Sequence, residues 1–151
     1  KGLMTSTPGQ DRHSGFLEGI KGSQIEVIFE ADCKWLEPEA KKEMQSALTR
    51  FEAIDAVYGH NDPSAHGAWL AAKQAGREQA IKFIGIDALP HEGVQYVQDG
   101  VLTATFQYPT GGAEAIATAL KILGGEKVEK HVTLGTRIFT AENVSAGGEA
   151  L

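Results

Sequence analysis

The stretch from Ala56 to Asp87 constrains the fold more than any other part of the chain. It reads AVYGHNDPSAHGAWLAAKQAGREQAIKFIGID, and its two ends are short apolar runs of strand length. Between them, small and aromatic residues recur at i, i+3, i+4 and i+7, which is one face of an α-helix: Ala65, Ala68, Trp69 and Ala72. Two strands joined through one helix by short connections predict a right-handed βαβ unit with parallel strands.

The rest of the chain continues this alternation of strands and helices. Hydrophobic spacing and Pro or Gly boundaries predict further helices near residues 8–22, 37–51, 90–99 and 111–124. Additional strands are predicted over residues 2–6, 25–29, 101–106 and 132–138, with a frayed tail over 145–151. The expected fold is a doubly wound, mostly parallel α/β sheet flanked by helices.

Composition narrows the classes of function. The 151 residues suit one domain, and hydrophobic and charged fractions of 42% and 23% are those of a globular protein. A net charge of −6 without any basic run argues against binding to nucleic acid or an anionic membrane. The residues after Lys1 do not have the charged and apolar regions of a signal peptide. They begin abruptly on what reads as a strand already under way, which suggests a fragment of a longer protein.

Polar and aromatic residues follow the predicted strands, and the carboxyl ends of parallel strands share one edge of a sheet, where ligands bind. The candidate ligand-binding residues are Arg12, Trp35, Asn61, Asp87 and Gln107. Carboxylate and amide groups exchange hydrogen bonds with hydroxyls, and a guanidinium can bridge two of them. An indole can cover the C–H face of a ring. This set suits a neutral, polyhydroxylated ligand.

Each of these residues also has a simpler interpretation. Asn61 could cap the helix that follows it, and Asp87 could be a turn residue. Arg12 could be a solvated surface charge, Trp35 a core or edge aromatic, and Gln107 an ordinary loop residue. Their expected convergence on one edge of the sheet is what favours a site.

Four motifs then point to a known family. They are RHSGF (12–16), AVYGHND (56–62), FIGID (83–87) and GVLTAT with Q-x-P (100–109). In this order and spacing, over nearly the whole chain, they resemble the periplasmic sugar-binding proteins of ABC transporters, of the ribose-binding type (class I). The resemblance implies a two-lobed clamshell, periplasmic or extracellular, that closes on a monosaccharide and docks on the transporter's membrane permease.

The resemblance also assigns roles. Arg12, Asn61, Asp87 and Gln107 would bind sugar hydroxyls. The family's stacking aromatic aligns with Cys33, so Trp35, two residues further on, is expected in its place.

The family's chains have two lobes, so this chain resembles the second lobe. Residues 1–107 would form the sugar-binding domain, and residues 108–151 a crossover helix, strand and tail that normally contact the missing first lobe. An apolar face over residues 111–134 is then expected to be exposed, unless its own lobe, a swapped neighbour or self-association covers it.

Two other classes of function remain. The same lobe serves as the ligand-sensing domain of lactose-repressor-type transcription regulators and of sensor kinases. An enzyme is disfavoured, because the chain has no G-x-S-x-G, H-E-x-x-H or Walker motif. The best metal candidates are His60, Asp62 and His66, but Pro63 and their spacing spoil a shared helix face. No metal or cofactor is expected.

Overall fold

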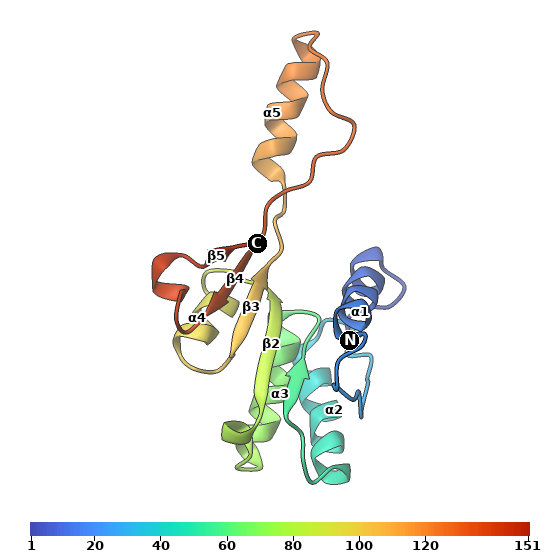
Figure 1. Cartoon of the computed structure of the whole chain (residues 1–151), viewed down its shortest axis with the longest axis vertical. Coiled ribbons are helices and arrows are strands. Elements are labelled where there is room, and N and C mark those ends of the chain that lie inside the picture. The colour runs from blue at the N-terminus through green and yellow to red at the C-terminus, as the bar shows by residue number, and fades with distance from the viewer.

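The computed structural model describes residues 1–151 and contains one mixed sheet (Figure 1). Its five strands lie in sequence order: β1 (Ala56–Tyr58), β2 (Lys82–Asp87), β3 (Ala104–Gln107), β4 (Arg137–Thr140) and β5 (Glu149–Ala150). The first three strands are parallel, and the last two are antiparallel to their neighbours. The α/β fold with a mostly parallel sheet is therefore confirmed.

Five α-helices accompany the sheet: α1 (Thr7–Ile20), α2 (Glu37–Arg50), α3 (Asp62–Gln74), α4 (Gly93–Gln98) and α5 (Gly112–Leu123). Short 3-10 turns lie at η1 (Glu78–Ala80) and η2 (Val144–Ala146). Proline occupies the first turn of α1, α2 and α3, where its missing N–H costs nothing. None of these helices combines the length and the apolarity needed to span a bilayer.

The βαβ unit over Ala56–Asp87 forms as predicted and makes the centre of the core. Helix α3 packs on β2, and α2 packs on α3. The alanine face of α3 is buried against Phe83 of β2. Small residues let the two helices approach closely, since a Cβ on Gly67 would lie 2.3 Å from the carbonyl oxygen of Glu37.

Several predicted elements need correction. Residues 2–6 form a turn, and residues 25–29 are extended but pair with no strand. The expected strand at 132–138 begins only at Arg137, and α4 begins at Gly93 instead of Pro90, which lies in a turn. The tail is ordered into β5 because Gly147 and Gly148, with φ of 89° and 78°, fold it back onto β4.

Helix α5 stands apart from the sheet (Figure 1). None of its residues is buried, and Ile116 and Leu123 are 66% and 84% exposed. The predicted exposed apolar face is therefore confirmed for α5. The strands β4 and β5 that follow return to the sheet beside β3.

Candidate functional site

The side chain of Arg12 joins the carboxyl ends of two parallel strands. Its Nη2 donates to Oδ1 of Asp87 at 2.8 Å, and its Nη1 donates to the carbonyl oxygen of His60. The side chains of Arg12 and Asp87 are only 11% and 29% exposed. Arg12 lies on α1, so this charge-assisted pair ties the first helix to the ends of β1 and β2. The interpretation of Arg12 as a free surface charge is wrong.

Two aromatic rings flank the Arg12 guanidinium. The guanidinium carbon, Cζ, lies 5.3 Å from the ring centroid of Trp35 and 4.8 Å from that of Tyr108. The Trp35 ring lies against Gly2, where a Cβ would come within 2.2 Å of it. Trp35 is thus placed beside Arg12, as the sequence predicted. Tyr108 was missed, and its only signal was its position directly after β3.

Asp87 ends β2 in an unusual backbone conformation. Asp87 and Ala88 have φ values of 121° and 52°, in a region that L-residues rarely adopt. Such strain is often found at ligand sites. Burial raises the pKa of the Asp87 carboxyl, and the neighbouring Arg12 acts in the opposite direction.

Gln107 lies directly opposite Asp87 in the register of β2 and β3. With Arg12, Ile86 and Tyr108 it lines a groove of about 410 Å³ between the start of α1 and β3. The predicted convergence therefore holds for the ends of β2 and β3.

Asn61 is 7% exposed and caps α3, since its Oδ1 accepts from the Ser64 N–H at 3.1 Å. Its Nδ2 donates to the carbonyl oxygen of Trp35, also at 3.1 Å. The capping interpretation is confirmed. Asn61 also holds the backbone at Trp35, whose φ is 69°, so part of its hydrogen-bonding capacity is used within the chain.

Asp62 is a fully buried carboxylate that the sequence suggested only as a weak metal candidate and not as a ligand-binding residue. Its Oδ1 accepts from Thr105 Oγ1 at 2.6 Å, and its Oδ2 accepts from the Ala88 N–H at 2.8 Å. Burial raises its pKa to about 7, although both hydrogen bonds act to lower it. Gly85 and Gly93 leave room for it, because a Cβ on either would clash with its oxygens. In the sequence, the only indication of this buried acid was the Asn61-Asp62 pair at the start of α3.

The three metal candidates have other surroundings. His60 is buried, and desolvation, with positive groups nearby, lowers its pKa to about 4. Nδ1 of His66 lies 2.6 Å from a Glu37 carboxylate oxygen, while Asp62 is bound to Thr105 and Ala88. No group of three His, Cys, Asp or Glu side chains is arranged to hold a metal ion.

Comparison with known proteins places this geometry in a family. The periplasmic binding protein domain family matches residues 1–127. A ribose import binding protein of Escherichia coli (strain K12) is 31% identical over 144 residues, covering 94% of this chain and 48% of the relative.

Solved structures agree with this match. The fructose binding periplasmic domain of a hybrid two component system has a TM-score of 0.91 and 43% identity, covering 96% of this chain and 49% of that one. An ABC transporter solute binding protein from Bacillus halodurans with bound myo-inositol has a TM-score of 0.86 and 28% identity, covering 96% and 51%. The chain thus spans about half the length of these proteins. It belongs to the periplasmic binding protein family.

Proposed function

We propose that this chain is one lobe of a periplasmic or extracellular protein that binds a monosaccharide or a related polyol without changing it. The observation that carries the proposal is the Arg12–Asp87 pair at the carboxyl edge of the sheet, flanked by two aromatic rings. The ligand-binding residues are Arg12, Trp35, Asn61, Asp87 and Gln107.

The chemistry of these groups favours hydroxyl ligands. Asp87 uses Oδ1 for Arg12, so its Oδ2 remains an acceptor for a hydroxyl. Nε of Arg12 is buried without a partner in the chain, and it is a donor that a ligand oxygen could satisfy. Trp35 and Tyr108 offer apolar ring faces beside these polar groups, as sugar recognition requires.

Relatives support this class of ligand. Their names and descriptions include ribose, fructose and myo-inositol, which are all polyhydroxylated. By the same reasoning we assign the full-length protein to ABC-type uptake, with a membrane permease as its partner. Neither a cofactor, nor a metal, nor nucleic acid, nor catalysis is part of this proposal.

The proposal also covers how this lobe meets the other lobe of the clamshell. Residues 1–107 form the ligand-binding part of the lobe, and residues 108–151 carry the crossover. The exposed apolar face of α5 docks on the other lobe, so that closure joins contacts from both sides around the ligand. In the isolated chain the same face favours self-association.

A second function has one observation in its favour. The fructose binding domain that is 43% identical to this chain is part of a hybrid two component system. The lobe could therefore belong to a ligand sensor with the same site and the same chemistry. A kinase module or a DNA-binding headpiece in the full-length sequence would decide for the sensor.

Calorimetric titration of the full-length protein tests sugar or polyol binding, which both functions require. The panel is ribose, allose, fructose and myo-inositol, with a polyol-free buffer as the blank. We expect saturable heat with at least one member. No heat with any member, from a protein shown to be folded by circular dichroism, would contradict the proposal.

A further inference from the structure

The side chain of Asp87 does not point in the direction that regular strand geometry would give it. Side chains alternate between the two sides of a strand. Gly85 of β2 faces Asp62, since a Cβ on it would clash with Oδ1 of that carboxylate. Ile86 faces the other side, where it lines the groove beside Arg12. A regular continuation of β2 would therefore point Asp87 toward Asp62, yet its Oδ1 lies 2.8 Å from Nη2 of Arg12.

The left-handed backbone at Asp87 and Ala88 accounts for this difference. Their φ values of 121° and 52° depart from those of a strand, so the chain turns at the end of β2 and redirects the Asp87 carboxyl. Neither residue is a glycine, and a left-handed conformation costs free energy at any other residue. A turn of this kind persists only where surrounding contacts hold it.

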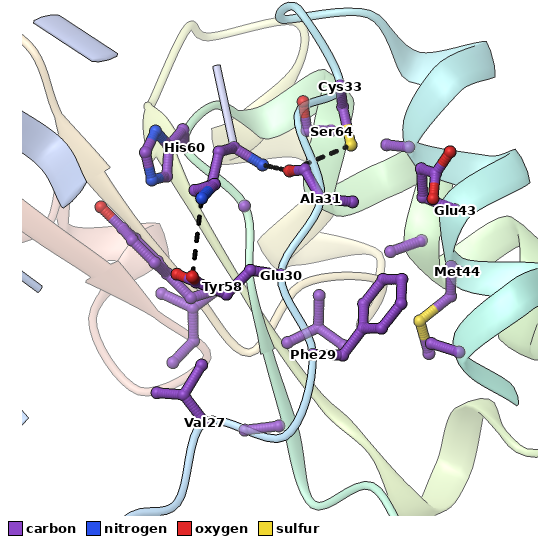
Figure 2. Close-up of a pocket in the computed structure, with 18 of the residues that line it drawn as sticks. Val27, Phe29, Glu30, Ala31, Cys33, Glu43, Met44, Tyr58, His60 and Ser64 are labelled. Carbon is purple, nitrogen blue, oxygen red and sulfur yellow. Dashed lines mark hydrogen bonds and ion pairs between the residues drawn. The ribbon is translucent and has the colours of Figure 1, made fainter. Parts of the chain in front are cut away.

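Arg12 is held from the end of β1, independently of this turn. Its Nη1 donates to the carbonyl oxygen of His60, and its own carbonyl oxygen accepts from the hydroxyl of Tyr58 at 3.3 Å. The rings of Tyr58 and His60 lie side by side, with their centroids 5.4 Å apart (Figure 2). The geometry of the Arg12–Asp87 pair thus depends on how the backbone at Asp87 is held.

Asp62 supplies the contact that holds the turn. Its Oδ2 accepts from the N–H of Ala88 at 2.8 Å, and Ala88 is itself buried. Its Oδ1 accepts from the hydroxyl of Thr105 at 2.6 Å, which fixes the orientation of the carboxylate. Another hydrogen bond at the turn, from the N–H of Tyr108 to the carbonyl oxygen of Asp87, is longer at 3.3 Å.

We propose that Asp62 is a positioning residue for ligand binding. Through the Ala88 N–H it sets the backbone at Asp87, so that the Asp87 carboxyl turns to Arg12 and presents its other oxygen to the ligand. Asp62 does not touch the ligand, because it is fully buried and both of its oxygens are bonded within the chain. This inference rests on the proposed function, and it requires that Asp62 affect sugar affinity only through Asp87.

NMR of the full-length protein measures the backbone at Asp87 directly. The three-bond coupling between the amide and α protons is small at a φ near 121° and large in an extended strand. We expect a small coupling at Asp87 in the wild type and a larger one in Asp62→Ala. The coupling should stay small in Asp62→Asn, whose amide can still accept from Ala88 and donate to Thr105. A large coupling in the wild type, or a small one in Asp62→Ala, would overturn the proposal.

A double-mutant cycle on sugar affinity tests whether Asp62 acts through Asp87. By calorimetry, Asp62→Ala should weaken binding at least ~10-fold in the wild-type background. In the Asp87→Ala background it should change affinity by less than ~2-fold, because the residue through which it acts is gone. Equal losses in the two backgrounds would overturn the proposal, since they would show that Asp62 acts on the lobe as a whole.

Met44→Ala is the control for a general loss of stability. Met44 is buried in the core on α2, so its truncation destabilises the lobe at a site that does not touch the turn. We expect its sugar affinity to stay within ~2-fold of the wild type. A loss of affinity as large as that of Asp62→Ala would overturn the proposal. If Asp62→Ala does not fold, Asp62→Leu replaces it, because leucine has nearly the shape of aspartate but accepts no hydrogen bond.

Failure of the proposed function is separable from failure of this inference. A folded wild type that gives no heat with any sugar of the panel overturns the proposed function. The coupling at Asp87, and its change in Asp62→Ala, then still decide whether Asp62 positions Asp87, because neither measurement needs a ligand.

Discussion

Oδ2 of Asp62 accepts a 2.8 Å hydrogen bond from the backbone N–H of Ala88, the residue that follows Asp87. Asp62 itself is fully buried below the edge of the sheet, where Thr105 of β3 donates to its other oxygen. The carboxylate thus holds the left-handed backbone at Asp87 and Ala88 to the neighbouring strand. In this arrangement a buried acid positions Asp87, the acid that pairs with Arg12 at the carboxyl edge of the sheet.

Asp62 makes stability depend on pH. Its pKa is raised from 3.8 to about 7 in the folded chain, so the folded state holds a proton that the unfolded state has released between these values. The protonated Asp62 therefore makes its full contribution to the free energy of unfolding below pH ~4. This contribution is lost as the pH rises to ~7, and the loss is at most about 4 kcal/mol. Urea unfolding at pH 4.5 and 7.5 measures the loss.

Asp62→Asn removes the titrating group, so we expect its unfolding free energy to vary less between these two pH values. Asp99→Asn, at an exposed carboxylate that bonds to Gln95, is the matched control and should keep the original dependence. An unchanged pH dependence in Asp62→Asn would show that Asp62 does not titrate in this range.

Asp87→Ala should weaken sugar binding by the full-length protein at least tenfold, about 1.4 kcal/mol. The change removes a hydroxyl acceptor and leaves the Arg12 guanidinium without its partner. Calorimetry with the best sugar of the panel measures it. Asp99→Ala is the control, and equal affinities in the two variants, both folded, would exclude Asp87 from the site.

Trp35 should report ligand binding by fluorescence. The chain has two tryptophans, and Trp69 lies on α3, where its ring stacks on His66. We expect the sugar-induced change in emission to disappear in Trp35→Phe and to persist in Trp69→Phe. The opposite result would mean that Trp35 does not contact the ligand and that another residue, such as Tyr108, supplies the stacking face.

Helix α5 should drive self-association of the chain of residues 1–151. Leu120 is 64% exposed on the apolar face, whereas Thr118 lies on the opposite side of the helix. Leu120→Lys should therefore shift light scattering toward the monomer, because a charge in an apolar contact is costly. Thr118→Lys adds the same charge and should not. Equal effects would point to net charge instead of the apolar face.

Local sequence patterns determined much of this protein. The period of the alanines in α3 and the short apolar runs on either side of it led directly to the βαβ unit, since each depends only on neighbours along the chain. The geometry of parallel strands then predicted that Asp87 and Gln107 would meet at one edge, and they do. The glycine boundaries of α5 and its apolar face were likewise local features.

Tertiary structure alone decided which extended segments became strands and which side chains met. A strand requires a partner edge, so residues 25–29 remain unpaired although their pattern alternates, while Glu149–Ala150 pairs because two glycines return it to β4. The contacts of Asp62 with Thr105, and of Arg12 with Tyr108, join residues more than forty positions apart. No local pattern predicts such pairs, because they follow from the packing of α1 and α3 against the sheet.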